Sequence, residues 1–229
     1  MILFDNVKKV RDEVAKYPQS VTLIAATKTQ SKETIDEFKA FAPDFALGEN
    51  RVQELVEKYD ERYEWHLIGQ LQTNKVKYIA DKAELIHSLD RTDLAKEIEK
   101  QAAKHDRVMP CLVEINMGGE ASKGGVEPCR ALDFIESMQE YPHIVVEGVM
   151  SVLPNSSDEV ELHRLYEKLR RIYEDAKCLE NCGKDIKYLS AGMSLDYKIA
   201  LAHGSNMIRL GRVLFGERIY ACNNTQNSK

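Results

Sequence analysis

Lys28 is the residue whose type and position most clearly point to covalent chemistry. It follows the apolar run 21–27, which is typical of a buried β-strand. An amine is costly to desolvate, so a lysine at the end of such a strand either reaches solvent or is held at a binding site. At a binding site, an amine can attack a carbonyl and form an imine. From position alone, the solvated lysine is the more common case.

Two further segments carry residues suited to bind an anion. Ser190–Ser194 offers hydroxyls and backbone N–H groups at the start of a predicted helix, where negative charge is favoured. Gly211 lets the backbone approach a ligand, and Arg209 supplies a fixed charge. Ordinary turn chemistry explains the glycines and serines equally well. Combined with a reactive lysine, these segments would suit an aldehyde that carries a phosphate, and pyridoxal phosphate is such a ligand.

The elements that must position these residues alternate between apolar strands and amphipathic helices. Apolar spacings of three and four over residues 1–16 predict an extra N-terminal helix. Eight strands, each followed by a helical segment, then predict an α/β protein with a single (β/α)₈ TIM barrel. The alternative is an open doubly wound sheet, but its glycine-rich first turn is replaced here by Lys28-Thr29-Gln30. The predicted strands are 21–27, 45–47, 65–68, 85–89, 110–115, 144–152, 188–189 and 207–210.

In such a barrel, binding residues lie at the carboxyl ends of the strands. Lys28, Ser194 and Gly211 all follow predicted strand ends, so we expect them to meet at one mouth. The loops after the seventh and eighth strands are where many barrels hold a phosphate. Asn50 follows the second strand and is expected beside the ligand, although it could instead cap the next helix.

Other polar residues in the predicted strands have a structural interpretation. His66 and His87 fall within the third and fourth strands, where satisfied interior histidines are more common than catalysts. Arg209 could pair with a barrel carboxylate such as Glu114. We therefore predict no catalytic role for these groups.

Bulk properties favour one cytoplasmic domain. The chain has 229 residues, 43% of them hydrophobic, which suffices for one core. We predict a domain over 1–222 and a polar, disordered tail over 223–229. A net charge of −5 gives no attraction for nucleic acid or anionic lipid, and no apolar run could span a membrane. No secretion signal is expected at the N-terminus. No exposed apolar stripe stands out, so we expect a monomer.

The cysteines predict neither disulfides nor a metal site. Their count of five is odd and their spacing is irregular. Cys178 and Cys182 are four residues apart, but no second pair or nearby histidine completes a site. We therefore expect no metal.

In its motifs, the chain resembles the pyridoxal phosphate homeostasis protein family, whose members have a barrel of the alanine-racemase N-terminal-domain type. The matching motifs follow one another from the first strand to the eighth and cover nearly the whole chain. The Gly-Glu-Asn and Trp-His-x-Ile-Gly motifs are the most specific. The segments are 26–29, 48–54, 65–75, 87–90, Asn116 with 119–123 and Gly125, 148–150, 189–194 with Asp196, and 209–211.

The resemblance implies that Lys28 holds pyridoxal 5′-phosphate as an internal aldimine. It suggests phosphate contacts from Ser194 and the Gly211 region, with Arg209 and Asn50 near the ring. Family members have no established catalytic turnover. They are thought to bind and deliver the cofactor, with pyridoxal phosphate-dependent apoenzymes as partners, and to balance intracellular vitamin B6 and amino-acid pools.

Two positions depart from the family pattern. A small hydroxyl residue usually follows the Arg-x-Gly motif, but this chain has Arg212, which removes one expected phosphate hydroxyl. The family's glycine before Asp196 is Leu195 here. We therefore expect the turn beside the phosphate to differ.

Enzymatic alternatives remain open at this point. They are a weak pyridoxal phosphate-dependent racemase or lyase, and a Schiff-base aldolase without cofactor. A racemase on this barrel needs a second acid/base across the substrate from the lysine, brought by a partner subunit's extra domain. The chain offers no evident place for that group, so we favour a cofactor-binding regulatory protein.

Overall fold

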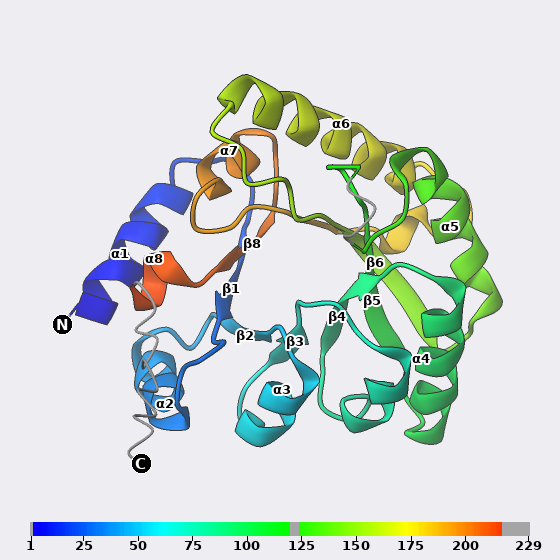
Figure 1. Ribbon diagram of the computed structural model, residues 1–229, viewed down its shortest axis with the longest axis horizontal. Helices are drawn as coiled ribbons and strands as arrows, with labels where there is room; N and C mark the ends of the chain where they lie inside the picture. The colour runs from blue at the N-terminus through cyan, green and yellow to red at the C-terminus, as the bar shows by residue number, and fades with distance from the viewer. Residues whose placement is uncertain (1, 120–123, 217–229) are drawn as a thin grey trace, which may run out of the picture.

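Eight parallel strands close into a barrel in the computed structural model, which describes residues 2–119 and 124–216 (Figure 1). Each strand pairs with the next along the chain. The last strand, β8 (Met207–Leu210), pairs back with β1 (Thr22–Ala26), and places Arg209 opposite Ile24. This pairing closes the sheet, so the predicted (β/α)₈ barrel is confirmed over the open doubly wound sheet.

Every predicted strand is found, and no strand end shifts by more than two residues. β3 and β7 are short, with three residues each. The remaining strands are β2 (Ala46–Glu49), β3 (Trp65–Leu67), β4 (Leu85–Leu89), β5 (Met109–Glu114), β6 (Ile144–Met150) and β7 (Tyr188–Ser190).

The helices surround the barrel on its outside (Figure 1). The segment from Thr73, predicted as a helix, is a 3₁₀-helix, η1 (Thr73–Tyr78), in which Val76 is the buried residue. The α-helices are α1 (Ile2–Val14), α2 (Lys32–Phe41), α3 (Val52–Lys58), α4 (Thr92–Lys104), α5 (Ala131–Ser137), α6 (Glu159–Lys177), α7 (Tyr197–Ala202) and α8 (Arg212–Phe215). Three more 3₁₀-helices are η2 (Pro128–Arg130), η3 (Met138–Glu140) and η4 (Gly183–Asp185).

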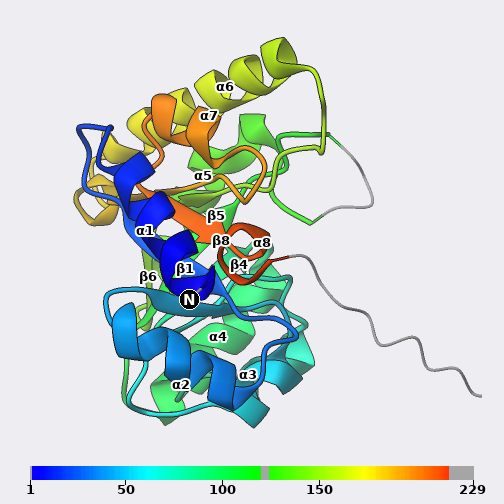
Figure 2. The same ribbon diagram turned by 90° about the vertical axis from the view of Figure 1, so that its left-hand side faces the viewer.

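The predicted extra N-terminal helix is α1, which packs beside α8 on the outside of the barrel (Figure 2). Val7 and Val10 on α1 are buried, and Nδ2 of Asn6 donates to the carbonyl oxygen of Leu214 at 2.9 Å. The first and last described helices therefore pack against each other. None of the helices within residues 2–119 and 124–216 is long and apolar enough to cross a membrane. The polar tail predicted at 223–229 lies outside the described residues.

The barrel interior is filled by side chains from alternate strand positions. On β1, Ile24 and Ala26 face inward, so Lys28, two positions further along, continues the inward-facing series at the mouth. A Cβ on Gly48 would lie 2.8 Å from Cγ2 of Ile24, so the interior has no room for it. Ligand space is therefore confined to the mouth. The inner cluster comprises Ile24, Ala46, Ile68, Leu85, Leu112, Met150 and Met207.

Candidate functional site

A cavity of about 410 Å³ opens at the carboxyl ends of the strands. This volume lies in the range of small-molecule sites, roughly 300–1,000 Å³. The structure brings all five sequence-predicted binding residues to its lining: Lys28, Asn50, Ser194, Arg209 and Gly211. They come from both ends of the chain and meet because β8 closes on β1.

Lys28 lies in the turn that follows β1 and is partly buried at the cavity wall. The turn is tight, because Gln30 N donates to the carbonyl oxygen of Thr27 at 2.9 Å. Thr29 has a φ of 70°, which is strained for a β-branched residue. Nζ of Lys28 donates to no other residue that the structure describes. Its amine is therefore not committed to an internal contact.

A buried polar network holds this strained turn. Oε1 of Glu49 accepts from Oγ1 of Thr27 and from Nζ of Lys58, both at 2.7 Å. Oε2 of Glu54 accepts from Thr29 N and from Nζ of Lys58, both at 3.2 Å. Burial raises the pKa of Glu49, and the hydrogen bonds from Lys58 and Thr27 oppose this effect. Sequence reasoning missed this network. The sequence signals for it were Glu49 at the end of an apolar strand and the pair of Glu54 and Lys58, which are four residues apart.

Arg209 is a buried cation at the cavity, 4% exposed. Its Nη1 donates to the carbonyl oxygen and Oγ of Ser190 at 2.9 and 2.6 Å, and its Nη2 donates to the carbonyl oxygen of Ser151 at 2.9 Å. All three acceptors are uncharged. Within the described residues, Arg209 forms no ion pair, so the predicted alternative of pairing with Glu114 is wrong. A buried charge without a counter-charge is costly, and this site therefore favours an anionic or electron-rich ligand.

Glu114 at the end of β5 is a second unusual charge at the mouth. Its Oε2 is buried and has no hydrogen-bond partner in the described part of the chain. Burial and the nearby Asp90 raise its pKa to about 7, although Arg209 acts in the opposite direction. Close to neutral pH, this carboxyl group is therefore present in both protonation states.

Ser194 connects the loops after β7 and β8. Its Oγ accepts from the N–H groups of Gly211 at 3.3 Å and Val213 at 3.2 Å. The backbone of Gly211 lies outside the left-handed region, and an added Cβ would make only ordinary contact, 3.5 Å from the carbonyl oxygen of Ala26. Glycine at this position therefore leaves space at the cavity wall without being required by strain.

The two departures from the family pattern both lie on the cavity lining. Arg212 is exposed and forms no ion pair with any described residue. Leu195 is 69% exposed and does not have a positive φ, so its position does not require glycine. The turn is closed by Asp196, whose Oδ1 accepts from Met193 N at 2.7 Å and whose Oδ2 accepts from the hydroxyl of Tyr166 at 2.6 Å.

Asn50 does not cap the following helix, so the alternative role considered for it from the sequence is wrong. The N-cap of α3 is Arg51, and it makes no side-chain cap hydrogen bond. The backbone of Asn50 packs closely on Gly69, where an added Cβ would lie 2.3 Å from the Asn50 carbonyl oxygen. The backbone of Asn50 is therefore fixed, and its amide lines the cavity.

None of His66, His87, Cys178 and Cys182 lines the cavity. His66 and His87 are buried, and a hydrogen bond of 3.0 Å joins Nδ1 of His66 and Nε2 of His87, which confirms the interior assignment. Cys178 is exposed whereas Cys182 is buried. Across 2–119 and 124–216, no three His, Cys, Asp or Glu side chains gather as a metal site.

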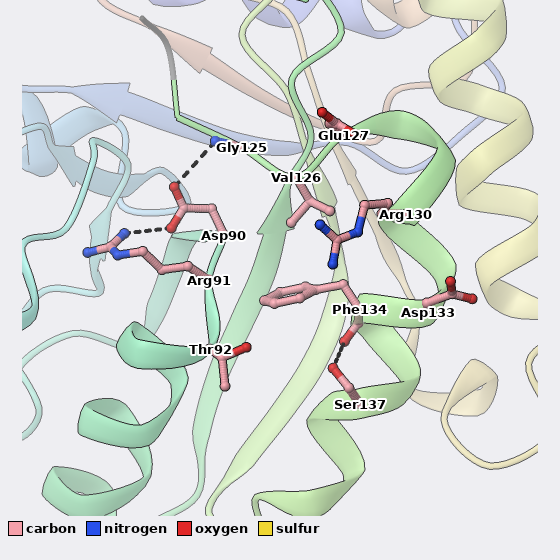
Figure 3. A pocket seen from close by; sticks show the side chains of 10 residues that line it. All are labelled: Asp90, Arg91, Thr92, Gly125, Val126, Glu127, Arg130, Asp133, Phe134 and Ser137. Atoms are coloured by element: carbon pink, nitrogen blue, oxygen red, sulfur yellow. Dashed lines mark hydrogen bonds and ion pairs between the residues drawn. The ribbon is translucent and has the colours of Figure 1, made fainter. Parts of the chain in front are cut away.

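A second cavity, of about 490 Å³, lies between the starts of α4 and α5 (Figure 3). Its lining includes Asp90, Arg91, Arg130 and Phe134, but none of the predicted binding residues and no lysine. Nη1 of Arg91 is paired with Asp90 at 2.6 Å. Although this cavity is larger, its lining has no amine that could form an imine, so we take the cavity at Lys28 as the candidate site.

Fold and cavity together define a class of (β/α)₈ barrels with a lysine just after the first strand. The family described as "Alanine racemase, N-terminal domain" matches residues 3–219. The pyridoxal phosphate homeostasis protein of Aquifex aeolicus is 39% identical over 222 residues, 95% of this chain and 96% of that protein. The corresponding protein of Escherichia coli K12 is 31% identical over 94% of this chain and 97% of its own length.

A solved structure agrees. PipY of Synechococcus elongatus, solved with PLP bound, superposes with a TM-score of 0.82 at 27% identity and covers 94% of this chain and 100% of PipY. The chain therefore belongs to the alanine racemase N-terminal domain family and, within it, to the pyridoxal phosphate homeostasis proteins.

Proposed function

We propose that this protein binds pyridoxal 5′-phosphate at the barrel mouth and acts in vitamin B6 and amino-acid homeostasis by holding and passing on the cofactor. The observation that carries the proposal is the meeting of an uncommitted amine, Lys28, with a buried cation, Arg209, that forms no ion pair within the described residues, in one cavity. Relatives named pyridoxal phosphate homeostasis proteins and the PLP-bound PipY support it.

Each binding residue suits one part of the ligand. Lys28 supplies the amine for covalent attachment to the aldehyde carbon, as a Schiff base. The hydroxyl of Ser194 and the N–H groups of Gly211 and Val213 suit the phosphate. Arg209 and Asn50 supply donors for the ring. The ligand itself would supply the aldehyde and the electron-withdrawing ring.

The cavity lining argues against efficient catalysis. Racemisation requires a second acid or base across the substrate from the lysine. Of the lining residues, Asp196 is the single carboxylate, and both of its oxygens already accept hydrogen bonds, from Met193 N and the Tyr166 hydroxyl. Burial and Asp196 raise the pKa of Tyr166, so this hydroxyl stays protonated. A racemase, lyase or aldolase activity is therefore the alternative outcome of the experiment below.

The test is intact-mass analysis after borohydride reduction, together with the visible spectrum, for wild type, Lys28→Ala and Lys32→Ala. Lys32 is the matched control, because it is an exposed lysine at the start of α2 outside the cavity. We expect a yellow wild type that carries one reduced cofactor on Lys28, a colourless Lys28→Ala and a Lys32→Ala that matches wild type. A colourless wild type that cannot be reconstituted with pyridoxal phosphate would refute the proposal.

Two other results would identify the enzymatic alternatives. A sugar adduct on Lys28 without added cofactor would indicate an aldolase. Steady amino-acid turnover near the enzyme median of about 10 s⁻¹ would indicate a racemase or lyase.

We further propose that residues 1–222 act as one monomeric, cytoplasmic domain that delivers the cofactor to pyridoxal phosphate-dependent apoenzymes. Support for the monomer comes from the exposed apolar side chains away from the cavity, such as Phe4, Val56 and Tyr78, which lie on α1, α3 and η1. Sedimentation at micromolar concentration tests this state, and a stable dimer would contradict it.

A further inference from the structure

A chain of hydrogen bonds crosses the barrel interior from the cavity to the opposite end. Nη1 of Arg209 lies 2.6 Å from Oγ of Ser190, which lies 3.3 Å from Nδ1 of His87. Nε2 of His87 lies 3.0 Å from Nδ1 of His66, whose Nε2 lies 2.8 Å from Oε1 of Glu64. The first four residues are buried. Glu64 directly precedes β3, at the amino end of the barrel, and its side chain is 58% exposed.

The donors and acceptors of this chain can be assigned from its cavity end. Arginine has only donors, so Oγ of Ser190 accepts from Arg209 and its single hydrogen points to Nδ1 of His87. That nitrogen must then be unprotonated, and Nε2 of His87 carries the proton and donates to Nδ1 of His66. By the same rule, His66 carries its proton on Nε2 and donates to Glu64. Every group along the chain is satisfied in this direction.

The opposite direction is disfavoured. If Nδ1 of His87 carried the proton, Oγ of Ser190 would accept two hydrogen bonds and its own hydrogen would have no acceptor among the described residues. A buried donor without a partner is destabilising. Burial, His66 and Arg209 also lower the pKa of His87 well below its ordinary value, so the ring is neutral.

We infer that His87 is a positioning residue for the ligand, which acts by orienting the Ser190 hydroxyl so that this hydroxyl holds the Arg209 guanidinium in place at the cavity. Within the described residues Arg209 donates to no carboxylate, so its position depends on uncharged acceptors. One of these, the Ser190 hydroxyl, can rotate. The unprotonated Nδ1 of His87 removes that freedom. This inference rests on the proposed binding of pyridoxal phosphate.

The experiment compares pyridoxal phosphate affinity, by absorbance titration, for wild type and four variants, together with histidine ¹H–¹⁵N NMR of the ligand-free protein. Ser190→Ala removes the hydroxyl, and His87→Leu removes the acceptor. His87→Asn keeps an acceptor oxygen near the position of Nδ1. The matched control is Ser88→Ala, because Ser88 is an equally buried serine whose hydroxyl donates to the Gly69 carbonyl oxygen at 2.8 Å, outside the chain.

We expect Ser190→Ala and His87→Leu each to weaken binding about tenfold, the effect of one hydrogen bond to a charged group. His87→Asn and Ser88→Ala should bind as wild type does. NMR of wild type should show the proton of His87 on Nε2, and of His66 on Nε2. If His87 has a purely structural role, His87→Leu and His87→Asn should bind pyridoxal phosphate equally tightly once their affinities are compared at the same fraction of folded protein. Equal affinities of these two variants would therefore overturn the inference.

Failure of the proposed function is distinguishable from failure of this inference. If wild type does not bind pyridoxal phosphate, the proposed function fails, and the NMR spectrum still tests the direction of the chain. If wild type binds but Ser190→Ala binds equally well, or if NMR shows the proton on Nδ1 of His87, the inference fails and the proposed function stands.

Discussion

Replacing Glu114 by glutamine tests the electrostatics of the barrel mouth, because one oxygen of this half-buried side chain is itself buried and has no hydrogen-bond partner among the described residues. Glutamine keeps the shape and removes the ionisation. Burial and Asp90 disfavour the charged carboxylate, and they raise its pKa from 4.5 to about 7. The wild-type protein must therefore either keep a proton on Glu114 or bury a poorly compensated charge.

The sign and size of the effect follow from linkage. Between pH 4.5 and about 7, the unfolded carboxyl group has released its proton whereas the folded one retains it, so stability falls as the pH rises. At 1.36 kcal/mol for each pH unit, this interval corresponds to about 3 kcal/mol. Below pH 4.5 the carboxyl group is protonated in both the folded and the unfolded protein, so it does not lower the free energy of unfolding. We expect Glu114→Gln to match wild type near pH 4 and to be more stable by up to about 3 kcal/mol at pH 8.

Urea denaturation of the ligand-free protein at several pH values measures this difference. Glu147→Gln is the matched control, because Glu147 lies on the neighbouring strand β6 and pairs with Lys187 at 2.8 Å. Its loss should destabilise by less than about 1 kcal/mol and give no gain at pH 8. A difference between Glu114→Gln and wild type that does not change with pH would refute the reasoning.

Three further predictions concern the cavity and its support. Arg212→Ser should weaken pyridoxal phosphate binding about tenfold and reduce the salt dependence of binding, because an unpaired cation is removed from the cavity lining. Titrations at low and high salt measure both effects. An unchanged affinity would exclude a contact between Arg212 and the phosphate. Gly48→Ala should lower the free energy of unfolding by about 1–3 kcal/mol, because its Cβ would lie 2.8 Å from Cγ2 of Ile24; a urea midpoint like that of wild type would show that the interior yields. Lys58→Met should cost about 3 kcal/mol, because it leaves the buried Glu49 carboxylate without its cation; the double variant with Glu49→Gln should recover part of this loss.

Periodicity was sufficient to predict the barrel, because each strand and helix contributes its own apolar pattern. The strands over 85–89 and 207–210 are found at the same residues, and the others differ by one or two at their ends. The segment from Thr73 was the exception among the helices. Apolar spacing alone does not distinguish a short 3₁₀ segment from one α-helical turn, so its hydrogen-bond pattern could not be foreseen.

The site was predictable where one residue type carried the signal, as for Lys28 and Arg209. It was not predictable where two ordinary residues become functional only through contact. Glu49 and Lys58 are nine residues apart in sequence, and their support of the lysine turn appears only once β2 lies beside β1. The direction of the hydrogen bonds from Ser190 through His87 to His66 likewise depends on which side chains share the barrel interior. These neighbours are set only when the sheet closes.

Ser194 has a consequence for the empty protein. Its hydroxyl accepts from the two backbone N–H groups, of Gly211 and Val213, that suit a phosphate oxygen. When a phosphate binds, its oxygen therefore replaces the Ser194 hydroxyl as the acceptor for these N–H groups. When the phosphate leaves, the hydroxyl accepts from them again, so neither N–H group is left without a partner. The net affinity is smaller than an open anion site would give, and the unloaded barrel keeps its shape. Both properties suit the proposed role, in which the protein alternates between a cofactor-loaded and an unloaded state without unfolding its own binding loops.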